Sequence, residues 1–156
     1  MNDRLNDLNY VKVSDHFHLS EFECRGKTCC HYAVKIMPRL LVVLECIRSY
    51  INRAYPTGAH PYALLIRSGY RCPKHNRAEG GVDNSYHCQG KAADLYAFGM
   101  KKSVLAKHVR ELAEHGPMRF RVGYYYREDR GGKKYTVLHI DVGEGPCVFG
   151  DAWNGK

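Results

Sequence analysis

The sequence predicts an α+β domain in which helices pack on a small, mainly antiparallel sheet that carries a zinc site. Three observations predict this class: two stretches with the spacing of amphipathic helices, several short apolar runs of strand length, and histidine and aspartate residues in or beside those runs. A chain of 156 residues can bury one core without disulfide staples. We therefore expect a single domain over residues 1–156.

Three helices are expected. A short one begins at 20–23, where Ser20 can cap the first turn. A longer one opens at Met37-Pro38 and extends to about Ala54, because proline is tolerated at the first helical position. Another extends from 101 to 115 and is ended by a Gly-Pro pair. The apolar positions expected to face the core are Leu40, Leu41, Leu44, Ile47, Ile51, Val104, Leu105, Val109 and Leu112.

Four strands are expected between and after these helices. A buried strand over 62–67 ends shortly before Arg71, and a second begins at Ala92, just after a glycine that lets the chain reverse. Residues 121–127 and 135–142 read as two strands joined by the polar turn 128–132, which is a hairpin signal.

Two histidines and an aspartate form the candidate metal site. His87 and Asp94 flank Gly90 in the segment 85–94, and His139 lies in the last expected strand. Two neutral imidazoles and one carboxylate leave a fourth tetrahedral position for water, as in catalytic zinc sites and unlike closed structural ones. These residues predict a zinc hydrolase; the alternative is that each histidine is simply packed or exposed.

Asp141 is expected to share a face of its strand with His139, because side chains two residues apart point the same way. Val137 belongs to that face too, whereas Leu138 and Ile140 fill the other. Asp141 can therefore reach the site, where it either accepts a proton or orients His139.

The order of these motifs resembles the zinc D-alanyl-D-alanine carboxypeptidases and peptidoglycan endopeptidases. That group includes phage enzymes and has a zinc fold similar to those of lysostaphin and the hedgehog signalling domains. The resemblance covers nearly the whole chain. The matching segments are His18–Phe22, Ser68–Asn76, the pattern Ser-x-His-x-x-Gly-x-Ala-x-Asp at 85–94, Gly123–Tyr125, and His-x-Asp at 139–141.

The resemblance implies that the zinc ligands are His87, Asp94 and His139. It also implies that Arg71 holds a substrate carboxylate or polarises the carbonyl under attack, a role that suits the fixed fork of guanidinium donors. A surface or turn-stabilising role remains the alternative for Arg71. Ser85 and Tyr124 are expected to contact substrate.

The general base is where this sequence departs from the family. Many relatives carry a Glu, Asp or His two or three residues before the last ligand, and here those positions are Val137 and Thr136. We therefore expect Asp141, or a carboxylate from residues 128–129, to take the proton of the attacking water.

The cysteines predict mostly free thiols. Their number, seven, is odd, and together with the lack of a secretory signal in residues 1–7 it indicates a reducing compartment. Cys24, Cys29, Cys30 and His31 either form a second, structural metal site or are small residues filling a crowded loop.

A formal charge of +8 favours an anionic partner, such as cell-wall polymers, or reflects no more than a basic surface. The basic residues are dispersed, which argues against nucleic acid, and no apolar run is long enough to span a membrane. We expect cytoplasmic synthesis, with action at the cell wall after release, as for a phage or prophage lysin.

The predicted function, by the resemblance, is zinc-dependent hydrolysis of a peptide bond in peptidoglycan, next to a D-amino acid, by a carboxypeptidase or endopeptidase. Two alternatives remain. The chain could be a zinc-containing cell-wall-binding module without catalysis, or a structural phage component that keeps the metal for stability.

Overall fold

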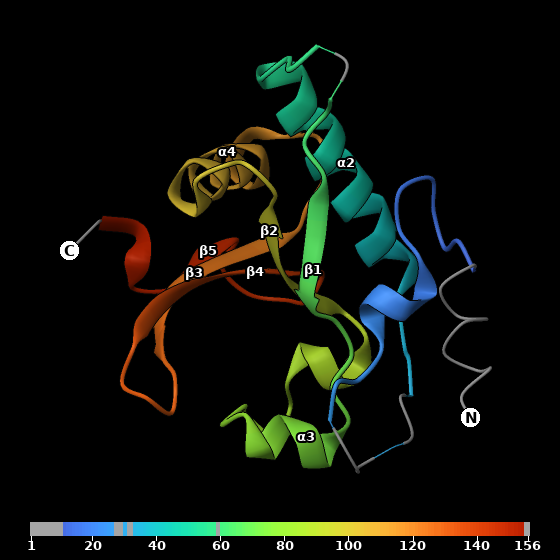
Figure 1. Cartoon of the computed structure of the whole chain (residues 1–156), viewed down its shortest axis with the longest axis vertical. Helices are drawn as coiled ribbons and strands as arrows, with labels where there is room; N and C mark the ends of the chain where they lie inside the picture. Colours follow the sequence, from blue (N-terminus) through green and yellow to red (C-terminus); the bar gives the residue numbers. More distant parts are fainter. Residues whose placement is uncertain (1–10, 27–29, 31–32, 59, 155–156) are drawn as a thin grey trace.

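The computed structural model describes residues 11–26, 30, 33–58 and 60–154 (Figure 1). Its helical elements are η1 (Leu19–Phe22), α2 (Pro38–Ala54), α3 (Pro73–Ala78), η2 (Tyr86–Gln89), α4 (Lys102–His115) and η3 (Ala152–Asn154). Its strands are β1 (Leu64–Ser68), β2 (Ala92–Ala97), β3 (Arg121–Glu128), β4 (Lys134–Asp141) and β5 (Val148–Phe149). None of the helices in these described ranges is both long and apolar enough to cross a membrane.

The five strands form one sheet in the order β1-β2-β4-β3-β5. Every pairing is antiparallel except that of β5, which lies parallel to β3. The expected hairpin is confirmed: β3 and β4 pair along their whole length, from Arg121 opposite Asp141 to Glu128 opposite Lys134. The predicted α+β class with a mainly antiparallel sheet is therefore correct.

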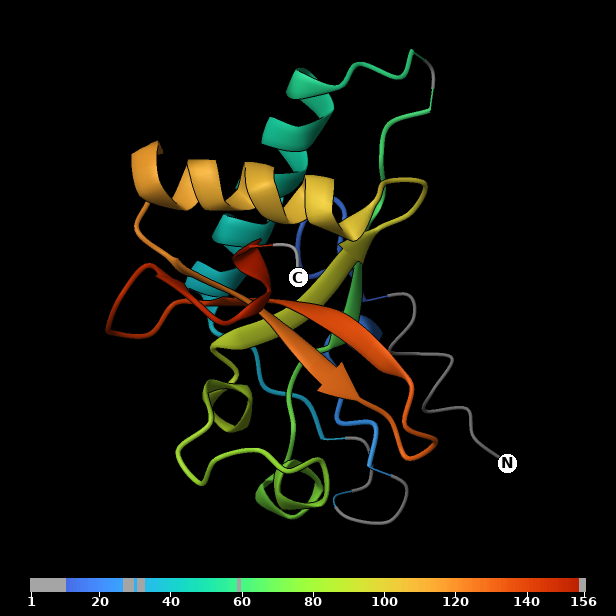
Figure 2. The ribbon, with the colours of Figure 1, turned by 90° about the vertical axis from the view of Figure 1, so that its left-hand side faces the viewer.

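The two long helices, α2 and α4, lie on the same side of the sheet, and α3 lies apart from them (Figures 1 and 2). The expected helix over 38–54 is confirmed, and it adds Val43 to the predicted buried side chains, while Leu41 is only partly buried. On α4 the buried residues are Leu105, Ala106 and Val109. Burial of these apolar stripes against the sheet stabilises the layer arrangement.

The first short helix is a 3-10 turn that begins one residue earlier than expected. Its N-cap is His18 and not Ser20, and the backbone N–H of His18 donates to Glu21 Oε1 at 2.9 Å. The turn buries Phe22, whose backbone carbonyl accepts a hydrogen bond from the N–H of Tyr70 at 2.9 Å. It thereby anchors the segment that follows β1.

The central strands have one apolar and one polar face. His139 on β4 is directly opposite Asp94 on β2 and Gly123 on β3, so these three residues form a row across one face of the sheet. The neighbouring positions Leu138 and Ile140 are fully buried beneath the helices. The predicted alternation along β4 is therefore confirmed, and the polar face carries the candidate site.

Candidate metal centre

Three ligand atoms converge on the polar face of the sheet. His139 Nδ1 lies 2.9 Å from Asp94 Oδ1 and 3.2 Å from His87 Nε2, and His87 Nε2 lies 3.3 Å from Asp94 Oδ1. Nitrogen and oxygen ligands of tetrahedral zinc, at their usual bond lengths, are about 3.3 Å apart. The donor set and its spacing therefore fit a zinc ion, and the structure brings together the three residues predicted from the sequence.

His87 is aimed by the turn that contains it. It lies in η2, where the Ser85 side chain accepts a hydrogen bond from its N–H, and the turn ends at Gly90 with φ 68°. A side chain at Gly90 would come within 2.5 Å of the Lys35 carbonyl oxygen, so the tight approach requires glycine. His87 Nδ1 lies 2.7 Å from the Gly69 carbonyl and donates to it, which leaves the Nε2 lone pair facing the site.

His139 is aimed by the opposite assignment of its two nitrogens. Its Nε2 lies 3.1 Å from Asp141 Oδ2 and donates to that carboxylate, so Nδ1 faces Asp94 and His87. The other carboxylate oxygen, Asp141 Oδ1, accepts a hydrogen bond from the Gly143 N–H at 2.9 Å and lies 3.5 Å from Arg121 Nε. Asp141 is 1% exposed, and both of its oxygens are engaged.

The charges in this cluster are strongly coupled. Burial alone would raise the pKa of Asp94, but the charge of His87 and hydrogen bonds with both histidines hold that pKa well below its usual range. Burial lowers the pKa of His87. Burial opposes protonation of His139 as well, yet its hydrogen bonds to Asp141 and Asp94 raise the pKa of His139 to about 9. The cluster thus favours a positive charge between Asp94 and His139. A metal cation bound there would replace the proton.

Arg71 stands beside the three ligands. Its Nη2 lies 3.7 Å from Asp94 Oδ2, and its backbone N–H donates to the His87 carbonyl at 3.3 Å. The Nε atom of Arg71 is buried and has no hydrogen-bond partner among the described residues. A buried guanidinium donor without a protein acceptor is costly, which is explained if a bound ligand supplies the acceptor.

The three candidate ligands line a cleft with a volume of about 1140 Å³. Ser85, Arg71 and Asp141 line it, together with five further arginines that the sequence did not single out: Arg25, Arg67, Arg121, Arg127 and Arg130. Some of these are held by aromatic rings, since the Arg67 guanidinium lies 4.6 Å from the Tyr135 ring centre and that of Arg127 lies 4.4 Å from the Tyr125 ring centre.

Tyr124, expected to contact substrate, does not line the cleft. It is 7% exposed and packs in the core, with its ring 5.4 Å from that of Trp153. The strand alternation brings Tyr125 to the cleft instead, 6.4 Å from the His139 ring, where burial raises the pKa of its hydroxyl. The signal that could have found Tyr125 is its parity with Gly123, which is paired with His139.

The carboxylates at 128–129 lie at the far end of the cleft. Glu128 is five residues along β3 from Gly123, and therefore about 16 Å from the row that contains His139. Asp129 Oδ1 accepts hydrogen bonds from the N–H groups of Gly131 and Lys133, both at 2.9 Å, so it closes the β3–β4 turn. Thr136, at the position where many relatives carry the base, gives its backbone carbonyl to Lys102 Nζ at 2.6 Å.

Comparison with known families identifies a match over most of the chain. A family model described as Peptidase M15 matches residues 15–129, which is more than half of the 156-residue chain. The matched part contains Arg71, His87 and Asp94 and ends before His139. Comparison with curated proteins gave no match. Since M15 peptidases depend on zinc and the three ligand atoms fit that ion, we conclude that the chain belongs to the Peptidase M15 family of metallopeptidases.

Proposed function

We propose that this protein hydrolyses a peptide bond in peptidoglycan, next to a D-amino acid, with zinc held by His87, Asp94 and His139. The observation that carries the proposal is the convergence of three ligand atoms within 3.3 Å of one another, at the base of a cleft and beside a buried arginine. Three protein ligands leave a coordination position open, which is the arrangement of catalytic zinc.

Zinc bound there supplies Lewis acidity, which polarises a peptide carbonyl and acidifies a water molecule. Arg71 supplies the fixed positive charge. Its buried Nε has no acceptor among the described residues, so the guanidinium can donate to a terminal carboxylate of the substrate or to the oxygen that gains charge during attack. Asp94 keeps the guanidinium in place, since Arg71 Nη2 lies 3.7 Å from its second oxygen.

For Asp141 we propose the orienting role rather than that of the base. Its Oδ2 accepts the proton of His139 Nε2, and its Oδ1 is held by the N–H of Gly143. A carboxylate with both oxygens engaged, and almost no exposure, is poorly placed to take a proton from water in the cleft. It fixes the tautomer and ring direction of a ligand histidine, as carboxylates behind metal-binding histidines commonly do.

The charge of the cleft supports a substrate that carries carboxylates. Six arginines of the described residues line it, and the guanidinium groups of Arg67 and Arg127 lie over tyrosine rings, which restrains them. Carboxylate-bearing wall peptides suit such a surface. Action at the wall after release from the cell, as by a phage or prophage lysin, is part of the same proposal.

One observation favours a second candidate, a zinc-containing wall-binding module without catalysis. Residues 136 and 137 are threonine and valine, and Asp141 is engaged by His139, so the usual positions offer no available base. Incubation of the protein with purified peptidoglycan, followed by mass analysis of released fragments, separates the two candidates.

The proposed peptidase should release peptides of defined length or a free D-amino acid, lose this activity to a chelator and regain it with zinc. The Arg71→Ala variant, which keeps the metal ligands, is the matched control for adventitious hydrolysis. If the zinc-loaded protein binds peptidoglycan and releases no fragments from any wall preparation, the protein is a binding module.

A further inference from the structure

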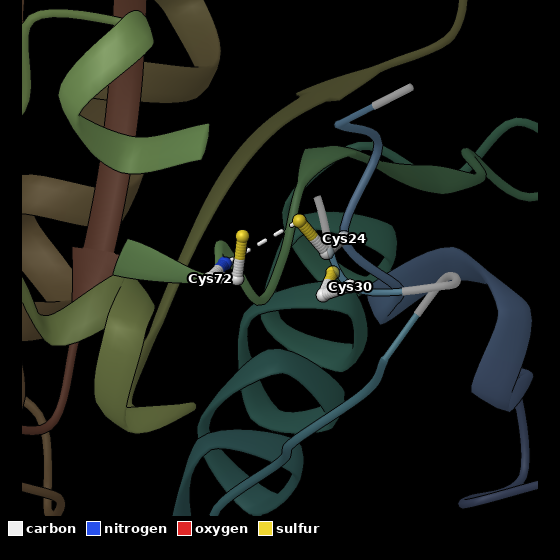
Figure 3. A group of neighbouring side chains, drawn as sticks. All are labelled: Cys24, Cys30 and Cys72. Carbon is white, nitrogen blue, oxygen red and sulfur yellow. Dashed lines mark hydrogen bonds between the residues drawn. The ribbon is translucent and has the colours of Figure 1, made fainter. Parts of the chain in front are cut away.

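A second cluster of metal-binding side chains lies outside the cleft. The Sγ atoms of Cys24, Cys30 and Cys72 all lie within 4.8 Å of one another (Figure 3). Cys24 follows η1, Cys30 lies in the loop before α2, and Cys72 is the N-cap of α3. The candidate second site expected at 24–31 is therefore completed by a residue more than forty positions away. Cys29 and His31, which were also expected there, lie outside the described residues.

We propose that Cys24, Cys30 and Cys72 bind a structural zinc ion, with His75 as the fourth ligand. His75 Nδ1 lies 3.3 Å from Cys24 Sγ. Zinc bonds of normal length hold two sulfur ligands about 3.8 Å apart, and a sulfur and a nitrogen ligand about 3.6 Å apart. The His75 nitrogen is near Cys24 Sγ but is not within 4.8 Å of all three sulfurs, so its ring must turn toward Cys30 and Cys72 to close a Cys3His site. That is the thiolate-rich, four-ligand type that serves structure and leaves no position for substrate.

The surroundings of the cluster suit thiolates. The backbone N–H of Cys72 donates to Cys24 Sγ at 3.3 Å, and the backbone N–H of His75 donates to Cys72 Sγ at 3.3 Å. Such donors stabilise negative sulfur. The second nitrogen of His75, Nε2, lies 3.7 Å from Glu79 Oε1, which is the carboxylate support typical of a metal-binding histidine.

The location of the cluster indicates what the ion would do. Cys72 directly follows Arg71. Gly69, two residues before Arg71, supplies the carbonyl that fixes the His87 tautomer. Gly69 is packed so tightly on η1 that an added side chain would lie 2.6 Å from the Phe22 Cα. A zinc ion joining Cys24 and Cys30 to Cys72 would therefore hold both sides of this contact, and with them the segment that positions Arg71.

The proposal is independent of the peptidase function and has its own test. The His139→Ala variant, which removes a ligand of the first site, is loaded with cobalt in place of zinc and examined by absorption spectroscopy. We expect about one metal ion per chain and a thiolate-to-cobalt charge-transfer band, since only thiolate ligands give that band. No cysteine is altered in this measurement, so it stands even if a cysteine variant fails to fold.

Cys72→Ser identifies the ligands, with Cys46→Ser as its matched control. Cys46 lies on α2, 3.8 Å from the sulfur of Met118 and outside the cluster. In zinc-loaded protein we expect Cys72→Ser to lose about one of two bound zinc ions, and Cys46→Ser to keep both. His75→Ala should weaken zinc retention against a chelator and keep the cobalt charge-transfer band.

Three results would overturn the proposal. One is a cobalt-loaded His139→Ala protein without a charge-transfer band. Another is equal zinc content in Cys72→Ser and Cys46→Ser. The third is a peptide map of the denatured, metal-free protein, purified without oxidant, that finds a disulfide between two of Cys24, Cys30 and Cys72.

Discussion

The two faces of strand β4 show how one short segment serves both folding and chemistry. Leu138 and Ile140 point into the core and are completely buried, whereas His139 and Asp141 point into the cleft from the positions between them. The apolar face packs against other apolar side chains, and its burial stabilises the fold. The polar face holds a buried carboxylate and imidazoles at distances that suit a cation, an arrangement whose cost in desolvation indicates function.

The difference teaches that the proposed metal site is built directly on paired strands of the sheet. Asp94 and His139 occupy directly paired positions of adjacent central strands, so the sheet register itself fixes their separation. Substitutions on the two faces should therefore have separable effects. Changes on the cleft face should affect metal and turnover with little change in folding, and changes on the core face should do the reverse.

His139→Ala should have the largest effect. It removes a ligand from the cleft face, so we expect loss of the zinc at this site and a fall in turnover on the order of a thousandfold or more. Circular dichroism should show an unchanged fold. His115→Ala, which changes an exposed histidine at the end of α4, is the control and should behave as wild type. Retention of zinc in the cleft by His139→Ala would mean that the ligand set is wrong.

Leu138→Ala, one position away, should act on the other face. Removing a fully buried leucine should lower the free energy of unfolding by about 2 to 5 kcal/mol, measured by urea denaturation. Zinc content per folded chain should stay at the wild-type value. A Leu138→Ala variant with the wild-type free energy of unfolding that nevertheless loses zinc would contradict the proposed separation between the faces.

Arg71→Ala should lower turnover by about a hundredfold, because it removes a donor that stabilises charge in the cleft. Elemental analysis should find the wild-type zinc content. Arg71→Lys should restore only part of the lost turnover, since a point charge does not reproduce the guanidinium fork. Unchanged steady-state kinetics in Arg71→Ala would reduce this residue to a structural role in the turn after β1.

Asp141→Asn should have the smallest effect on the cleft face. If Asp141 orients His139, the change should weaken zinc binding by about ten- to a hundredfold, and excess zinc should restore most of the turnover. A competition titration with a chelator gives the affinity. The opposite result, normal zinc affinity with turnover that excess zinc does not restore, would assign Asp141 as the base.

Much of this molecule follows from the sequence because its signals are local. The apolar spacing of 38–54 predicts α2, and the alternation in 135–142 predicts which side chains of β4 face the cleft. The positions of Tyr124 and Tyr125 could not be predicted in this way, because two adjacent tyrosines carry no local sign of which one faces the core. The pairing of Gly123 with His139 decides it.

Two further features depend on contacts between distant segments. The approach of Cys72 to Cys24 requires that α3 begin beside η1, and no spacing within 24–31 indicates that. The ion pair of Asp141 with Arg121 likewise requires the pairing of β4 with β3. Side-chain type and parity therefore predicted the three residues that converge on the polar face, whereas the contacts around them depend on tertiary packing.

The central claim is that the polar face of the sheet holds zinc through His87, Asp94 and His139. A crystal structure of the zinc-loaded protein, with anomalous diffraction recorded on both sides of the zinc absorption edge, tests it most directly. We predict an anomalous peak within about 2.0 to 2.2 Å of His87 Nε2, His139 Nδ1 and a carboxylate oxygen of Asp94, with one coordination position facing the cleft. No peak among these three atoms in zinc-loaded crystals, or a zinc ion bound by a different set of side chains, would contradict it.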